Sequence, residues 1–182
     1  MIYNVELKKL RDTIDSVKKN PETAKKVAKI EGVCNIDEGN GPQFEAEIIF
    51  EKGKMNFEMA QPTFLGGDGS RPSPMHYCLF ALASCYAATF TTVAAMEDFP
   101  LDGLKIVAEN RIDFSKVLGL SDTPPIEGVK ITAYVKSDAP EPEIRRIEQL
   151  AKERCPVSFC LTNPIKLETE LEIRGRQRDA AA

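Results

Sequence analysis

Two short stretches near residue 50 alternate between apolar and polar side chains with a period of two. That period places successive side chains on opposite faces of a strand, so each stretch predicts a strand with one buried face. The sequence EKGK between them is typical of a hairpin turn, and GVCNIDEGNGPQ (32–43) before them predicts a loop. The apolar positions are Phe44, Ala46, Ile48 and Phe50 in the first stretch and Met55, Phe57 and Met59 in the second.

The first 30 residues follow the helical period instead. Leu7, Leu10, Ile14 and Val17 recur at steps of three and four and form a narrow apolar stripe between charged positions. The sequence NPETAKKVAKI (20–30) predicts a second helix, with its asparagine as N-cap and its proline at the first helical position. Such a stripe needs a surface to pack on, either in its own domain or across a dimer.

A long apolar segment runs from Met75 to about Met96, after Ser73 and Pro74, which suit a helix N-cap and first turn. Apolar residues lie on nearly all of its faces, which is typical of a buried helix of roughly 30 Å. Its polar residues argue against a membrane span. These residues are Ser84, Thr89, Thr91 and Thr92.

The C-terminal half continues with strand and helix patterns. LKIVAENRIDF (104–114) and GVKITAYVKS (128–137) predict two strands. PEPEIRRIEQLAKERC (140–155) predicts a helix that ends before Pro156, and NPIKLETELEI (163–173) predicts a last strand. No linker is long enough to separate independent domains, so the order of elements predicts an α+β fold.

Charge and composition narrow the function classes. The formal net charge of -4 argues against binding to nucleic acid, which needs a basic patch. The charged N-terminus lacks the apolar region of a secretion signal, so we expect a cytoplasmic protein that does not insert into a membrane.

Five cysteines are the candidate chemistry. An odd number without a secretion signal does not fit a disulfide framework, so each is a buried apolar residue, a metal ligand or a reactive thiol. Cys85 lies midway along the long apolar helix, and Cys155 lies at the end of a different helix. If the fold brings them together, they form a dithiol that can cycle between thiol and disulfide. Cys34 lies in the predicted loop and is expected to be exposed.

The other two cysteines have several interpretations. Cys78 precedes Cys85 by two helical turns and is interpreted as core packing, with a second reactive thiol as the alternative. Cys160 follows Cys155 closely enough for thiol exchange to be an alternative to a passive role. A zinc site formed by His76, Cys78, Cys155 and Cys160 is a further alternative, but its ligand spacing fits no standard zinc motif.

Three pieces of sequence combine around these cysteines: GGDGSRPSP before the apolar helix, ALASC inside it, and CPVSFCLTNPI about 70 residues later. Over residues 44–173 the chain resembles the OsmC/Ohr family. The resemblance implies an OsmC-like fold, with antiparallel sheets around long buried helices, and an intertwined homodimer with active sites at the subunit interface. We accordingly expect an N-terminal helical extension (1–40), an OsmC-like domain (41–174) and a mobile C-terminal tail (175–182).

The resemblance also implies a reaction. In the family, a helix cysteine attacks an organic hydroperoxide and becomes a sulfenic acid, which a second cysteine resolves as a disulfide. Cys85 matches the attacking thiol and Cys155 the resolving thiol. The implied partners are a small organic hydroperoxide and a dithiol, such as a lipoyl group, or a small thiol as reductant. No metal or bound organic cofactor is required.

A cysteine in mid-helix needs a positive group to become a thiolate, because burial favours the neutral thiol and the helix dipole acts only near its ends. The Ohr branch uses an arginine held by a glutamate. Met75 stands at the position of that glutamate, and the early loop DEGNGPQFEAE contains no arginine. Arg71 and Arg111 are the candidate thiolate activators, and the chain is placed nearer the broader OsmC-like branch.

Two other functions remain open: a non-enzymatic dimeric protein that binds a small apolar ligand, and a thiol redox sensor without peroxide turnover.

The sequence LGGDGSRPSP lacks the lysine of a P-loop, so its glycines are expected to form a tight turn. An apolar pocket would suit an organic hydroperoxide better than hydrogen peroxide. Its candidate lining is Met55, Met59, Met75, Met96, Phe57, Phe64 and Phe80.

Overall fold

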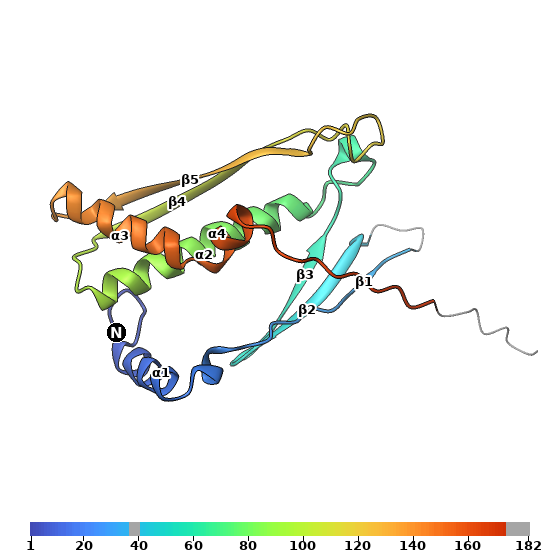
Figure 1. The fold of residues 1–182 in the computed structure, drawn as a ribbon. Coiled ribbons are helices and arrows are strands. Elements are labelled where there is room, and N and C mark those ends of the chain that lie inside the picture. Colours follow the sequence, from blue (N-terminus) through green and yellow to red (C-terminus); the bar gives the residue numbers. More distant parts are fainter. Residues whose placement is uncertain (37–40, 174–182) are drawn as a thin grey trace, which may run out of the picture.

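The computed structural model describes residues 1–36 and 41–173 of the chain (Figure 1). The described residues form helices and two antiparallel sheets, which confirms the predicted α+β fold. The first sheet, ordered β1-β2-β3, contains β1 (Gly32–Cys34), β2 (Phe44–Phe50) and β3 (Gly53–Met59). The second sheet contains β4 (Gly103–Ile112) and β5 (Ile126–Lys136).

The predicted hairpin is confirmed as β2 and β3. Ala46 pairs with Phe57 and Ile48 with Met55, so the apolar faces of the two strands coincide. The predicted loop 32–43 is wrong at its start, because Val33 pairs with Glu45 in the edge strand β1. A strand of three residues forms by pairing with its neighbour, and its local composition gives no signal for this pairing.

The long helix α2 (Pro74–Met96) confirms the predicted segment and its N-terminus. The backbone N–H of Ser73 donates to His76 Nδ1 at 3.1 Å and closes the first turn. The glycines before it form the expected tight turn, with positive φ angles at Gly66 and Gly69. α2 lies along β4 and β5, whereas the β1–β3 sheet extends away from its N-terminal end (Figure 1).

α2 is buried on one face only, which corrects the prediction of a helix buried all round. The buried face includes Leu82, Tyr86 and Phe90, whereas Phe80 on another face is 65% exposed. α2 is long and apolar enough to cross a membrane, but core helices of soluble proteins can have the same length and composition. Its buried face packs against α3 (Glu141–Arg154) and β4, as in a core helix.

The hydrophobic core lies between α2, α3 and the β4–β5 sheet. α3 confirms the predicted helix, and Ile147 and Ala151 from its apolar stripe are fully buried. A short helix, α4 (Pro156–Thr162), follows directly and was not predicted. Pro156 ends α3 as expected, but proline is also favoured at the first position of a helix, and here it begins α4.

The N-terminal segment is helical only in part. α1 (Leu7–Lys19) confirms the first predicted helix, but the second reduces to the 3₁₀ turn η1 (Pro21–Ala24). Asn20 caps that turn through Oδ1, as expected of an N-cap. Residues 25–31 are exposed and not helical, because a charged run without a packing surface gains little from forming a helix. Tyr3 ties the segment to the core by donating its hydroxyl to Phe99 O at 2.8 Å.

The predicted last strand over 163–173 is wrong for this chain by itself. These residues form neither helix nor strand and are exposed. The alternating apolar side chains are therefore present without a sheet to join, since a strand needs a neighbour for its backbone hydrogen bonds. They are Ile165, Leu167, Leu171 and Ile173. The predicted tail 175–182 lies outside the described residues.

Candidate active site

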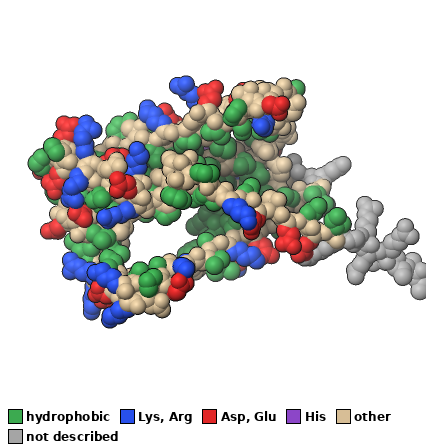
Figure 2. All heavy atoms as spheres, viewed as in Figure 1, with side chains coloured by type: hydrophobic (Ala, Val, Ile, Leu, Met, Phe, Trp, Pro, Cys, Tyr) green, Lys and Arg blue, Asp and Glu red, His purple; other side chains and the backbone are tan. Residues whose placement is uncertain are grey.

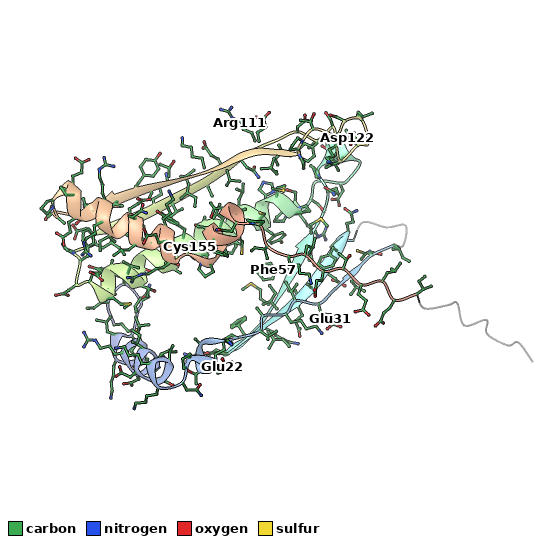
Figure 3. All side chains as sticks on the ribbon, in the orientation of Figure 1. Glu22, Glu31, Phe57, Arg111, Asp122 and Cys155 are labelled. Atoms are coloured by element: carbon green, nitrogen blue, oxygen red, sulfur yellow. The ribbon has the colours of Figure 1, made fainter. Side chains whose placement is uncertain are left out.

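Two cysteines from distant parts of the chain meet inside the core. Cys85 lies midway along α2, and Cys155 lies at the break between α3 and α4 (Figure 3). Their Sγ atoms are 3.6 Å apart, within hydrogen-bond distance for sulfur. Cys155 is fully buried, whereas Cys85 is partly exposed. A disulfide, with an S–S bond of about 2.05 Å, can therefore form after a small approach of the two side chains.

The exposed side of Cys85 faces an apolar pocket of about 820 Å³. Figure 2 shows hydrophobic side chains around the hollow between the α2 half of the molecule and the β1–β3 sheet. The lining residues come mainly from β2, β3 and α2, and the glutamate Glu58 is a charged member of the wall. They are Ile30, Phe44, Ala46, Ile48, Phe57, Glu58, Met59, Pro74, Tyr77, Phe80, Ala81, Ser84, Cys85 and Ala88.

The pocket residues expected from the sequence are confirmed in part. Phe57, Met59 and Phe80 line the pocket. The other four, Met55, Met75, Met96 and Phe64, do not belong to its lining. Phe64 packs instead against Phe114, with ring centroids 4.8 Å apart.

The two thiols have different electrostatic surroundings. Burial raises the pKa of the Cys85 thiol, and the neighbouring Cys155 adds to that increase. Burial also acts to raise the pKa of the Cys155 thiol. Ser158, through its side chain and backbone, and Cys85 can donate hydrogen bonds to the Cys155 thiolate, and together they outweigh burial and lower the pKa. The negative charge of the reduced pair is therefore held better on the buried sulfur than on the one that faces the pocket.

Polar groups around Cys155 come from three helices. The Ser158 hydroxyl on α4 is buried and makes no hydrogen bond within the described part of the chain, so it can turn toward the Cys155 sulfur. On α2, Tyr86 donates its hydroxyl to Glu148 Oε1 of α3 at 2.9 Å. Burial and this carboxylate raise the pKa of Tyr86, so the phenol stays protonated beside the cysteine pair.

Within the described residues, neither candidate arginine is hydrogen-bonded to a cysteine sulfur. Arg71 donates from Nε to Glu58 at 2.6 Å, and Glu58 lines the pocket. Arg111 lies exposed on β4, on the outer side of the molecule in Figure 3.

The remaining cysteines are all exposed in this chain. This matches the expectation for Cys34, although that residue ends strand β1 and does not lie in a loop. It corrects the interpretation of Cys78 as core packing, because Cys78 lies on a face of α2 that the chain leaves uncovered. His76 is used in the N-terminal turn of α2. Within residues 1–36 and 41–173, no group of three or more His, Cys, Asp or Glu side chains could hold a metal ion.

A sequence model described as OsmC-like protein matches residues 67–170, more than half of the chain. The chain belongs to the OsmC-like family. The match includes Cys85 and Cys155, the α2 helix and the α3–α4 break. A search of curated proteins found no match to the chain.

Solved structures of the family share the fold. An organic hydroperoxide resistance protein OsmC from Legionella pneumophila matches with a TM-score of 0.57 and 19% identity, covering 76% of this chain and 92% of that one. An OsmC-like protein from Mycoplasma pneumoniae matches with a TM-score of 0.56 and 19% identity, covering 75% and 88%. A putative organic hydroperoxide resistance protein from Vibrio cholerae, with captopril bound in one of its active sites, has a TM-score of 0.53 and 14% identity, covering 76% and 87%.

The sequence reasoning missed several polar residues around the site. Ser158 stands in the CPVSFC motif, where its distance of three residues from Cys155 could have indicated a helical turn around that sulfur. Tyr86 follows Cys85 directly, but nothing in the sequence links it to Glu148. Glu58 lies on a predicted strand, and only the fold brings it to Arg71.

Proposed function

We propose that this OsmC-like protein is a thiol-dependent peroxidase that reduces organic hydroperoxides. The observation that carries the proposal is the 3.6 Å separation of Cys85 and Cys155 at the wall of an apolar pocket. Family membership and the hydroperoxide resistance proteins among the structures of the same fold support a peroxide-related role.

The exposure of the two sulfurs supports different roles for them. Cys85 is partly exposed and faces the pocket, so it is the thiol that can attack the terminal oxygen of a hydroperoxide. Attack breaks the O–O bond, releases the alcohol and leaves a sulfenic acid on Cys85. Cys155 is buried behind it and attacks that sulfur, which releases water and forms the Cys85–Cys155 disulfide. A dithiol, such as a lipoyl group, or a small thiol restores the reduced pair.

The pocket favours an organic substrate over hydrogen peroxide. Its wall is formed almost entirely by apolar side chains, which gain free energy by covering a hydrocarbon group but gain little from a small, fully polar molecule. The hydrocarbon part of the hydroperoxide would lie along β2 and β3, with the peroxide group directed at Cys85.

The working form we propose is an intertwined homodimer. The pocket is open in one chain, and its rim includes Phe80, which is 65% exposed. Segment 163–173, which belongs to no strand, and the exposed face of α2 add further apolar surface. A second copy that covers these surfaces would close the pocket and exclude water from the reacting sulfur.

A count of free thiols tests the peroxidase. Cumene hydroperoxide added to the reduced protein is expected to consume two thiols per chain. Cys85→Ser is expected to lose neither, and Cys155→Ser to stop at a sulfenic acid that a dimedone-type reagent traps. Cys160→Ser is the matched control, because this cysteine is exposed on α4. An unchanged thiol count in the parent protein would exclude the peroxidase.

A dimeric protein that binds a small apolar ligand without turnover is the second candidate. Two observations favour it: the raised pKa of the Cys85 thiol, caused first by burial, and the engagement of Arg71 by Glu58. It predicts unchanged thiols with cumene hydroperoxide together with saturable binding of cumyl alcohol in the pocket, measured by calorimetry.

A further inference from the structure

The helices α2 and α3 hold the two sulfurs, and the contact between them is mostly apolar. α3 lies alongside α2, and one buried cluster contains Phe90, Ala94, Ile147, Ala151 and Cys155 (Figure 1). Apolar burial has no direction, and the small side chains of Ala94 and Ala151 give this contact little relief. The apolar contact therefore holds the helices together but does little to fix how far α3 lies along α2.

The cysteine pair depends on that register. The sulfurs are 3.6 Å apart, so the formation of an S–S bond requires them to approach by roughly 1.5 Å. A shift of α3 by one residue moves its side chains by about 1.5 Å along the helix axis and turns them by about 100°. An error of a single residue in register is thus as large as the whole approach that disulfide formation requires.

A directional contact joins the same two helices beside the sulfurs. Tyr86 of α2 is 3% exposed and donates its hydroxyl to Glu148 Oε1 of α3 at 2.9 Å. Tyr86 follows Cys85 directly, and Glu148 precedes Cys155 by two helical turns on the same face of α3. Each end of this hydrogen bond is therefore attached, through a short piece of helix, to one of the two reacting cysteines.

We infer that Tyr86 and Glu148 are positioning residues, whose hydrogen bond fixes α3 on α2 in the register that places Cys155 against Cys85. This inference rests on the proposed peroxidase function, in which Cys155 attacks the sulfenic sulfur of Cys85. In that step the S–S bond forms, the S–O bond breaks, and the proton of Cys155 leaves with the hydroxyl group as water. Neither positioning residue belongs to the lining of the pocket.

The chemistry of this contact suits a fixed register. A hydrogen bond to a carboxylate is stronger than one between neutral groups, and burial of the phenol strengthens it further. Burial and Glu148 raise the pKa of Tyr86, so the hydroxyl keeps the proton that it donates. A second polar contact joins α3 to the far end of α2: Arg146 Nη1 donates to Glu97 at 2.8 Å. Their side chains are 49% and 31% exposed, so that ion pair contributes little.

Exchange with glutathione tests the positioning without any peroxide. In a protein whose Cys34, Cys78 and Cys160 are replaced by serine, the remaining dithiol reduces glutathione disulfide to two glutathione molecules and becomes the Cys85–Cys155 disulfide. The equilibrium constant of this exchange gives the effective concentration of one thiol at the other.

Tyr86→Phe in this protein keeps the ring and loses the hydroxyl. We expect it to lower the effective concentration about tenfold, because a hydrogen bond to a charged group contributes at least about this factor. A value equal to that of the parent protein would overturn the inference.

Substitutions of Glu148 separate the hydrogen bond from the packing. Glu148→Gln keeps a carbonyl oxygen that can accept from Tyr86, so its loss is expected to be smaller than that of Glu148→Leu, which has no acceptor. Adding Tyr86→Phe to Glu148→Leu should lower the effective concentration no further, because both changes remove the same contact. Equal losses for Glu148→Gln and Glu148→Leu would contradict a role of the hydrogen bond.

The peroxide reaction gives a second measurement. With cumene hydroperoxide, Tyr86→Phe is expected to slow the closing of the disulfide, so a dimedone-type reagent should trap more Cys85 sulfenic acid than in the parent protein. A residue that only stabilises the fold would lower the melting temperature without raising the trapped fraction, and that result would also overturn the inference.

Controls separate the possible failures. Glu97→Leu removes the exposed contact between the same helices and is expected to keep the parental effective concentration. A loss equal to that of Glu148→Leu would overturn the assignment. If Tyr86→Phe does not fold, as judged by circular dichroism, the comparison of Glu148→Gln with Glu148→Leu decides. If cumene hydroperoxide consumes no thiols in the parent protein, the peroxidase fails, whereas the glutathione exchange still reports the positioning.

Discussion

The two halves of this chain differ in how they cover their apolar residues. The half formed by α2, α3, α4 and β4–β5 contains the core cluster, in which Phe90, Ile147 and Cys155 are fully buried. In the β1–β3 sheet, only Ala46 is buried within a strand, while Ile49 is 78% exposed and Met55 is 55% exposed. One half is a complete core, and the other presents apolar residues that its own chain does not cover.

This difference explains why the candidate site lies where the halves meet. The packed half fixes Cys155 and holds it against Cys85, whereas the open half supplies the pocket wall opposite Cys85. Rigid placement of the sulfurs and an accessible substrate pocket are thus provided by different parts of the molecule. The open half also explains our proposal of a dimer, because exposed apolar area of this kind is typical of a protein interface.

The largest expected effect is in the packed half. Phe90→Ala is expected to lower the free energy of unfolding by about 3–5 kcal/mol, because it leaves a cavity in a fully buried core. Urea denaturation at low protein concentration measures it. The matched control in the open half is Ile49→Ala, expected to cost less than about 0.5 kcal/mol. Equal losses would remove the distinction between the two halves.

A smaller effect is expected from the segment after α4. Leu171→Asp together with Ile173→Asp should weaken the dimer about a hundredfold, since burial of the two side chains contributes about 3 kcal/mol. Sedimentation velocity across a dilution series measures the change, with the exposed Glu170→Gln as control. A parent protein that stays monomeric at every concentration would contradict the dimer.

The smallest effect is expected at the two arginines. Arg71→Ala should reduce kcat/KM for cumene hydroperoxide by up to about fivefold, mainly through KM, because Glu58 in the pocket wall loses its ion-pair partner and a partly exposed ion pair contributes little. Arg111→Ala should leave kcat/KM unchanged. A larger loss for Arg111→Ala would show that the outer face of β4 takes part in the reaction.

The accuracy of the sequence predictions depends on the range of the interaction that forms each element. The hairpin and the two longest helices were predicted well, because their apolar periods and their caps are local signals. The second predicted helix and the last strand failed because each depends on packing or strand pairing with other elements, and within the described part of the chain residues 25–31 and 163–173 belong to no helix or strand. α4 was missed because Pro156 was interpreted only as a stop.

The candidate site likewise combines residues that local motifs indicate with contacts that only the fold creates. Cys85 and Cys155 stand in motifs that resemble a family, but no local pattern encodes the distance between them. The partnership of Arg71 with Glu58 and that of Tyr86 with Glu148 join residues 13 and 62 positions apart. No local pattern encodes such contacts, because they depend on how whole elements pack.

By itself, the sequence determined the element types, the α+β class and the two cysteines worth attention, because backbone periodicity and helix capping act over a few residues. Only the tertiary structure decided that the two sulfurs lie 3.6 Å apart and that one is buried while the other faces a pocket. It also decided that no lysine or arginine of the described residues is hydrogen-bonded to either sulfur. These properties arise from the packing of α2 against α3 and α4, and packing joins residues whose separation along the chain carries no signal.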